Sequence, residues 1–338
     1  MYIGQCLLPD DKIKSLAKDL SEDTTLGLSY KDALSEIKDK FNVVFSKLKI
    51  PEEIWNEDFF EPYKDIVLNR VKDLITIDGA LIDYNFINDP KLKLDINVFL
   101  ANKLIESFNS KVREADNFKE SHIYEIKQGD NWVKADISVT SYAKEIKDEK
   151  DLNKAKPFKI SQYKKEDVVP NAGMVIGNTF DSIARDFFSG EDITKKSYPN
   201  IDSRRLKELK TELENVKTYF DRIYKGKYKV IARPFPIAST FTDSTGKKFT
   251  IAGETDLLVV TPNGIKIYDF KVNSSKSDIE LVDTYTNQLS LYKRIINDEM
   301  PFLNVDTGGL IVADINYYKT RGILKIKDGI ITYKDKNI

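Results

Sequence analysis

Two aspartates, a glutamate and a lysine occur close together between Ile251 and Tyr292, in an order that can bind a divalent cation. In a β-strand, residues two apart point to the same face, so Asp269 and Lys271 of the segment YDFKV must emerge side by side. The preceding segment FTIAGETDLLVV is rich in β-branched and apolar residues, which also favours a strand. The turn signal TPNG at residues 261–264 separates the two segments, so the sequence predicts an antiparallel hairpin.

Such a hairpin would place Asp256 across from the side that carries Asp269 and Lys271, and Glu254 would share the face of Asp256. Carboxylates so close together repel one another unless a cation compensates them, and hard oxygen ligands select Mg²⁺ or Mn²⁺. A bound ion would lower the pKa of an attacking water and neutralise charge that grows on a phosphoryl group. Lys271 would orient that water or stabilise the transition state, so the pattern indicates hydrolysis of a phosphate ester.

Three short motifs follow one another here and continue into the helix that is predicted next. They are Gly-x-x-Asp at Gly253–Asp256, Asp-x-Lys at Asp269–Lys271 and Gln-x-x-x-Tyr at Gln288–Tyr292. In this order they resemble the PD-(D/E)XK nuclease superfamily, and more narrowly its RecB-like branch. The i, i+4 spacing of the third motif puts both of its side chains on one helical face, in agreement with that pattern.

The resemblance implies a role for each matching residue. Asp256 and Asp269 would be metal ligands and Lys271 the catalytic lysine, while Gln288 and Tyr292 would lie beside the substrate. Mg²⁺ or Mn²⁺ would be the cofactor and DNA the substrate. Each motif alone is weak, because an Asp-x-Lys pair is common on a solvated strand face. The ordered combination on strand, turn, strand and helix favours a nuclease.

The family also places a histidine or an acid near the start of an upstream helix. In GMVIGNTFDSIARDFF, Gly177 leads to Asp181, and a carboxylate is a better ligand for Mg²⁺ than the usual histidine. Asp181 is therefore the third proposed ligand, with Glu254 in reserve. A competing interpretation makes Asp181 the surface ion-pair partner of Arg185, one turn away, and Asp186 is a rival acid.

For residues 136–338 the resemblance implies an α/β, restriction-endonuclease-like core, αβββαβ, with a mixed sheet flanked by helices. Its parts are the Ser-rich opening DISVTSYAKEI, helices over 177–188 and 203–224, strands KVIARPFPIAS, KFTIAGETDLLVV and IKIYDFKV, the helix with the Gln-x-x-x-Tyr motif, and the strand GGLIVADI. The closing segment RGILKIKDGIITYK predicts a hairpin at residues 327–329.

Residues 1–135 are predicted to form a mostly helical region of unassigned role. Apolar residues recur at helical spacing in DALSEIKDKFNVVFSKLKI, in the segment that Pro51 opens, and in VFLANKLIESFNSKV. These apolar stripes are interpreted as core. His122 is the sole histidine and is interpreted as structural, because no Cys or His lies nearby.

Composition limits how the protein could hold nucleic acid and where it works. With 53 basic and 54 acidic residues among 338, the formal net charge is −1, so DNA binding must come from local patches. The candidates are Lys154, Lys156, Lys159, Lys164, Lys165, Arg204, Arg205, Lys247 and Lys248. One cysteine, Cys6, excludes both an internal disulfide and the four-cysteine iron–sulfur cluster of some RecB-like domains. No apolar run approaches a membrane span and no secretion signal is evident, so a bacterial or phage-infected cytoplasm is expected.

The sequence thus predicts a Mg²⁺- or Mn²⁺-dependent deoxyribonuclease, with exonuclease action at DNA ends favoured by analogy with the RecB-like branch. The helical region would gate DNA ends or dock a helicase or another recombination or phage protein. One alternative is a catalytically silent nuclease fold that binds DNA ends or protein within a larger assembly. A second alternative is a processing endonuclease. Polarity, strand preference, DNA versus RNA and oligomeric state are left open.

Overall fold

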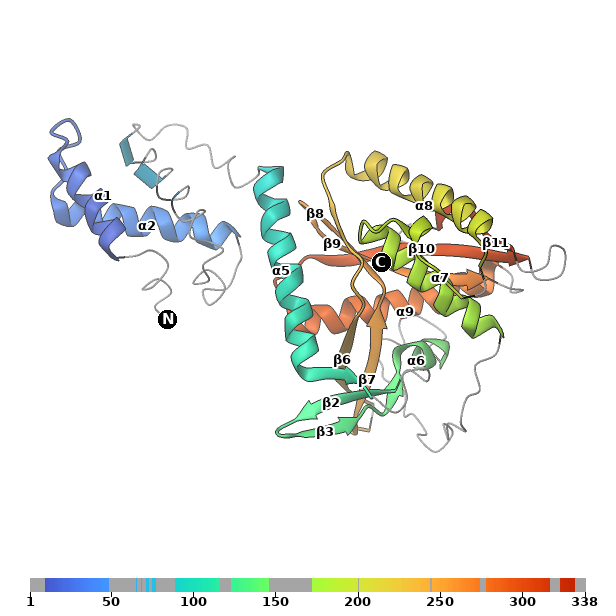
Figure 1. Cartoon of the computed structure of the whole chain (residues 1–338). Coiled ribbons are helices and arrows are strands. Elements are labelled where there is room, and N and C mark those ends of the chain that lie inside the picture. The colour runs from blue at the N-terminus through green and yellow to red at the C-terminus, as the bar shows by residue number, and fades with distance from the viewer. Residues whose placement is uncertain are drawn as a thin grey trace. The chain divides into compact units, whose positions relative to one another are not determined.

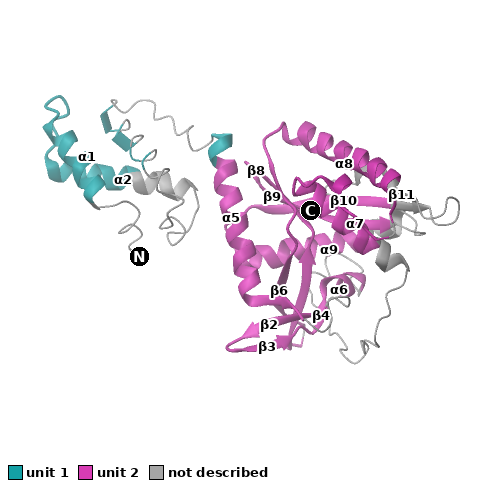
Figure 2. Cartoon of the chain, viewed as in Figure 1, with its two compact units in different colours: residues 1–92 teal, residues 93–338 magenta. Residues whose placement is uncertain are grey.

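The chain divides into two compact units, residues 1–92 and 93–338 (Figure 2). The computed structural model describes residues 10–48, 65, 68, 71–72, 75–76, 89–115, 123–145, 172–199, 201–243, 245–273, 278–316 and 323–331. Of the residues singled out above, Cys6, His122 and the lysines between 154 and 165 lie outside these ranges, and the side chain of Arg205 is not described. Within them, no helix has the length and apolar character needed to cross a membrane.

The described part of the first unit is helical, as predicted (Figure 1). Helix α1 (Asp10–Glu22) packs against α2 (Tyr30–Leu48), with Leu16, Leu20 and Ile37 buried. Ser29 begins α2 with a capping interaction, because its hydroxyl oxygen accepts the Asp32 N–H at 3.2 Å. The predicted helix after Pro51 lies mostly outside the described residues.

The second unit starts upstream of the domain boundary suggested at residue 136. Helix α5 (Pro90–Lys111) leads into a three-stranded antiparallel sheet of β1 (Val112–Glu114), β2 (Tyr124–Gln128) and β3 (Asn131–Lys134). Asn97 Nδ2 donates to the Thr261 carbonyl at 2.8 Å, and Lys111 Nζ contacts Glu299 Oε1 at 2.6 Å. These contacts join α5 to the end of β8 and to Glu299, so the second unit includes α5 from Lys93 onwards.

The central sheet of this unit is mixed, as predicted, and its strand order is β11-β10-β9-β8-β5 (Figure 1). Its strands are β5 (Lys229–Ile231), β8 (Leu257–Thr261), β9 (Gly264–Asn273), β10 (Val305–Asn316) and β11 (Ile323–Ile331). Helix α9 (Asp278–Glu299) connects β9 to β10, which are parallel, and the other pairs are antiparallel. A separate sheet contains β4 (Ile137–Ser138), β7 (Lys248–Thr255) and β6 (Phe235–Thr242).

Helices cover both faces of the central sheet. The remaining helices are α6 (Val139–Glu145), α7 (Ala172–Phe188), the 3₁₀ helix η6 (Ile193–Lys195) and α8 (Ser203–Tyr224). Phe180 of α7 packs edge-on against Phe270, and Phe220 of α8 packs against Tyr268, so both helices cover the face of β9 to which these rings point. Asp269 points to the opposite face, where it meets Gln288 of α9.

Two of the three strands predicted ahead of α9 are broken. KVIARPFPIAS forms β5 and β6, and the break ends at Pro234, which has no N–H to donate to a ladder. KFTIAGETDLLVV forms β7 and β8, with a break at Asp256 where the chain passes from the sheet of β6 to the sheet of β9. The predicted hairpin between β8 and β9 is confirmed, because Thr261 pairs with Gly264 around a two-residue turn.

The predicted hairpin at residues 327–329 is wrong. These residues lie inside β11, which pairs with β10 on either side of them but not at 327–329 themselves. The register shifts on β10 between Ile311 and Ala313, whose partners are Ile330 and Ile326. The turn-prone Lys-Asp-Gly sequence is therefore accommodated by a bulge in a continuing strand.

Candidate active site

Two of the residues predicted to bind metal, Asp256 and Asp269, lie where β8 begins and β9 continues beyond it. Leu257 of β8 pairs with Tyr268 of β9, so the antiparallel register brings Asp256 opposite Asp269, as predicted. Asp256 Oδ2 accepts the Phe270 backbone N–H at 2.8 Å, so this carboxylate replaces a missing strand partner. Both carboxyl groups are buried, with Asp256 8% and Asp269 1% exposed.

Lys271 emerges beside Asp269, as the strand alternation predicted. Its ammonium forms an ion pair with Asp269 Oδ2, donates to the Phe270 carbonyl at 3.0 Å and lies 5.1 Å from the centre of the Tyr285 ring. Burial alone would lower the pKa of Lys271, but the Asp269 and Asp256 carboxylates raise it above its usual value. Lys271 is therefore a fixed cation in this structure.

Gln288 and Tyr292 share one face of α9, as predicted, and both are buried. Gln288 Nε2 donates to Asp269 Oδ1 at 3.2 Å and to the Tyr292 hydroxyl oxygen at 2.7 Å. A side chain at Gly253 would place its Cβ 2.9 Å from Val139 Cγ2 and 3.2 Å from Tyr292 Cε1, so the glycine allows α6 and α9 to approach β7. In this arrangement Gln288 is hydrogen-bonded to Asp269, and Tyr292 is hydrogen-bonded to Gln288.

Arg185 of α7 reaches across to the strands. Its Nη2 lies 3.0 Å from Glu254 Oε1 and 3.1 Å from Asp256 Oδ1. The competing interpretation expected Arg185 to pair with Asp181 at the surface, whereas its ion pairs are with Glu254 and Asp256. The rival acid Asp186 is engaged elsewhere, because it accepts the Tyr198 hydroxyl at 2.6 Å and pairs with Lys196 at 3.0 Å.

The electrostatics connect Asp181 to the same cluster. Burial and then the charge of Asp256 raise the pKa of Asp181 to about 7, although Lys271 and Arg185 oppose the shift. Burial also raises the pKa of Glu254. Four carboxylates, of Asp181, Glu254, Asp256 and Asp269, face two cations, Arg185 and Lys271, which leaves a formal charge of −2 when all are ionised.

This donor set fits a divalent cation in charge and chemistry, because carboxylate oxygens are the ligands that Mg²⁺ and Mn²⁺ prefer. Buried Gln288 Oε1 has no hydrogen-bond partner within the described structure, which adds a hard oxygen at the cluster. Nevertheless, within the described ranges no group of three or more acidic, histidine or cysteine residues lies close enough together to hold a metal ion. Arg185 holds Asp256 Oδ1 and Lys271 holds Asp269 Oδ2, so the two cations occupy oxygens that an ion would need.

Two residues that sequence reasoning did not assign to the site take part in it. The spacing of Arg185 from Asp181 predicts an ion pair along α7, but it does not show that the guanidinium reaches Glu254 and Asp256. Tyr124 of β2 is buried, and burial followed by the charges of Glu254, Glu114 and Asp256 raises the pKa of its phenol. No local signal marks Tyr124, because its neighbours in space are remote along the chain.

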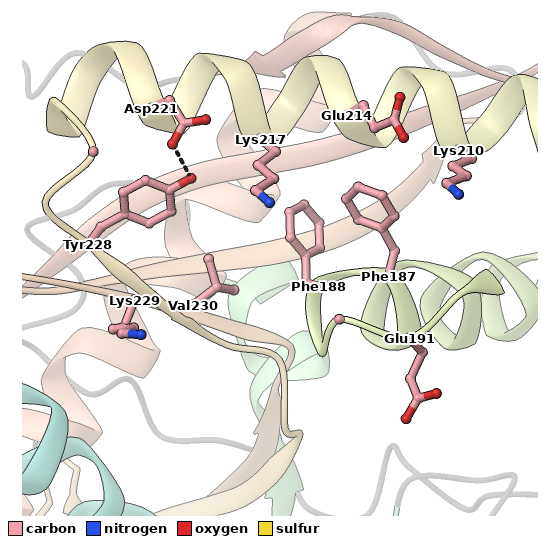
Figure 3. A pocket seen from close by; sticks show the side chains of 12 residues that line it. Phe187, Phe188, Glu191, Lys210, Glu214, Lys217, Asp221, Tyr228, Lys229 and Val230 are labelled. Carbon is pink, nitrogen blue, oxygen red and sulfur yellow. Dashed lines mark hydrogen bonds between the residues drawn. The ribbon is translucent and has the colours of Figure 1, made fainter.

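A pocket of about 550 Å³ lies away from these residues, between the C-terminal end of α7, α8 and β5 (Figure 3). Aromatic Phe187, Phe188 and Tyr228 line it together with three lysines and three acids, so it has no charge excess that would attract a polyanion. None of the predicted site residues lines it.

The described basic candidates for nucleic-acid contact are few. Lys247 and Lys248 are exposed at the start of β7. Arg204 is exposed and pairs with Glu208 at 3.4 Å, one turn along α8, so part of its charge is compensated.

No family model matches the chain, and no curated protein matches it either. The assignment of a function therefore depends on the motifs and on the geometry of the site.

Proposed function

We propose that this protein is a metal-dependent DNA nuclease of the PD-(D/E)XK type, similar to the RecB-like branch. One observation carries the proposal: Asp256 and Asp269 face each other at the end of a strand pair, and Lys271 and Gln288 both contact Asp269. A buried pair of carboxylates held by a lysine is electrostatically expensive, and such arrangements concentrate at functional sites.

The order of elements supports a restriction-endonuclease-like core. Helix α7 precedes the antiparallel strands, and α9 then crosses from β9 to the parallel strand β10. The broken strands β5–β6 and β7–β8 take the places of single strands in the αβββαβ scheme. The helical unit of residues 1–92 and the elements α5 to β3 are additions to that core.

The residues would divide the work as follows. Asp181, Asp256 and Asp269, with Glu254 in reserve, would hold Mg²⁺ or Mn²⁺. Such an ion supplies Lewis acidity and charge neutralisation at the scissile phosphate. Lys271 keeps its proton beside Asp269 and would stabilise the developing negative charge. Gln288 and Tyr292 would act through Asp269, because their hydrogen bonds fix the orientation of its carboxylate.

The proposal is tested with end-labelled linear DNA and covalently closed circular DNA, each incubated with Mn²⁺ or Mg²⁺. Wild-type protein should shorten linear DNA, and Asp269→Asn and Lys271→Met should each reduce the rate by roughly 100-fold or more, as expected for loss of a main electrostatic contribution. Asp306→Asn is the matched control. Asp306 is also an aspartate in ion pairs with lysine, here Lys266 and Lys293, but it lies outside the cluster. Cleavage of the circles would replace the exonuclease assignment, which rests on the resemblance alone, with a processing endonuclease.

A second candidate is a silent nuclease fold that binds DNA ends or protein. The observation that favours it is the ion pair between Arg185 and Asp256, which occupies an oxygen of a proposed ligand. In the same assay, wild-type protein that retains labelled DNA on a filter but leaves it intact with both metals would support this candidate and reject catalysis.

A further inference from the structure

Arg185 is placed to do more than neutralise its neighbours. Its Nη2 is shared between Glu254 Oε1 and Asp256 Oδ1, while its Nε is buried and has no hydrogen-bond partner within the described residues. The side chain as a whole is nevertheless 26% exposed, so Arg185 is not sealed in the core. A guanidinium carries five N–H donors, and the contacts to Glu254 and Asp256 use only its Nη2.

Arg185 and a metal ion would compete for the same atom. Asp256 Oδ2 accepts the Phe270 N–H, which ties it to the backbone of β9, so Oδ1 is the oxygen of Asp256 that is more accessible to a cation. Arg185 contacts that oxygen at 3.1 Å. A divalent ion bound to Oδ1 would be repelled by the guanidinium at this distance, so ion binding at Asp256 would favour movement of the guanidinium away from it.

The helix that carries Arg185 would not need to move. Phe180, Ile183 and Ala184 of α7 are completely buried in the core beneath α8 and β9. The arginine side chain can therefore swing about a fixed backbone while it keeps Glu254 as one partner. A phosphate oxygen is the acceptor that suits the freed donors, since guanidinium binds phosphate in a planar, two-pronged geometry.

We propose that Arg185 exchanges partners: it neutralises Asp256 while no metal ion is bound, and it binds a phosphate oxygen of the nucleic acid once an ion occupies Asp256. This inference rests on the proposed metal site. The alternative is that Arg185 is only a clamp that holds Glu254 and Asp256 in place. The two roles differ in sign, because loss of a competitor strengthens metal binding, whereas loss of a clamp weakens it.

The experiment measures two affinities on the full-length protein. Calorimetric titration with Mn²⁺ gives metal affinity without DNA, and fluorescence anisotropy with labelled DNA in Ca²⁺ gives nucleic-acid affinity. Arg185→Gln should bind Mn²⁺ at least about tenfold more tightly than wild type, from the removed repulsion. It should bind DNA roughly 10- to 100-fold more weakly, from the lost charged hydrogen bonds.

Two further variants serve as controls. Arg185→Lys keeps the charge and loses the fork, so its Mn²⁺ affinity should stay near the wild-type value while its DNA affinity falls. This variant also covers the case in which Arg185→Gln fails to fold. Arg222→Gln removes an exposed arginine that lies over the Tyr219 ring, and it should change neither affinity.

Each outcome decides between the roles. Weaker Mn²⁺ binding by Arg185→Gln, or unchanged DNA binding by both Arg185 variants, would overturn partner exchange while leaving the nuclease proposal intact. Absence of Mn²⁺ binding by the wild type would overturn both. If Arg185→Gln binds Mn²⁺ more tightly and DNA more weakly than wild type, but the wild type cleaves no DNA, partner exchange is supported and catalysis is rejected.

Discussion

Replacement of Lys271 by methionine is the most direct probe of how the cluster is balanced. Lys271 forms an ion pair with Asp269, whose side chain is only 2% exposed, whereas the lysine side chain is 19% exposed. Methionine retains an unbranched apolar chain of similar length and removes the charge. The substitution would therefore leave a buried carboxylate without its nearest cation.

The expected loss of stability follows from burial. Removal of one partner from a buried ion pair typically costs about 3–5 kcal/mol, because the other charge remains desolvated. For a unit the size of residues 93–338, that corresponds to a fall in Tm of roughly 6–20 °C. The double variant Lys271→Met with Asp269→Asn removes both charges, so it should recover to within about 1 kcal/mol of wild type.

Urea denaturation followed by circular dichroism at pH 7 and pH 5 measures these differences. Burial raises the pKa of Asp269, with Lys271 opposing the shift, and loss of the lysine raises it further. A raised carboxyl pKa stabilises the folded protein at low pH, so the Lys271→Met defect should shrink from pH 7 to pH 5. A single variant as stable as wild type at pH 7, or a double variant no better than the single, would refute the electrostatic account.

Three further predictions concern packing, charge and domain limits. Gly253→Ala should destabilise the protein by about 1–3 kcal/mol because its Cβ would crowd Val139 and Tyr292, whereas Gly177→Ala, with open space around it, should not; thermal unfolding compares them. Lys266 and Lys293 lower the pKa of Asp306 despite its burial. The ionised Asp306 carboxylate therefore stabilises the folded protein near pH 7, and this contribution is lost as the pH falls. The urea midpoints of wild type and Asp306→Asn should converge towards about pH 3. A fragment of residues 93–338 should unfold cooperatively in calorimetry, whereas residues 136–338, which lack α5 and its contacts to Thr261 and Glu299, should not.

The sequence predicted those features that depend on local periodicity. Alternation placed Asp269 and Lys271 on one face of β9, and the two-residue turn fixed the register that brings Asp256 opposite Asp269. The limits of α8 agree with the prediction because a helical apolar stripe ends at Tyr224, and Gly226 follows with a positive φ of 67°. These features need only neighbours in the chain.

Features that depend on distant partners were missed. Arg185 could be assigned to a helix but not to Glu254 and Asp256, because the rotation of α7 is set by the burial of Phe180 and Ile183 against the sheet. The residues 327–329 carry a hairpin signal, yet they form a bulge inside β11, because the residues before and after them pair with β10. Tertiary pairing overrides turn propensity when a long neighbouring strand offers its hydrogen bonds.

The break at Asp256 connects these two groups of results. Leu257, Leu258, Val259 and Val260 are all buried, so a strand that continued without interruption would carry Asp256 into an apolar interior. Instead the chain changes sheets at this residue, and its carboxylate accepts the Phe270 N–H while it faces Asp269 and Arg185. An apolar residue would suit the local pattern better, and sites where a sequence departs from its own local pattern are commonly functional. Asp256 at the break is thus a residue that costs folding stability and that supplies a carboxylate for the chemistry that we propose.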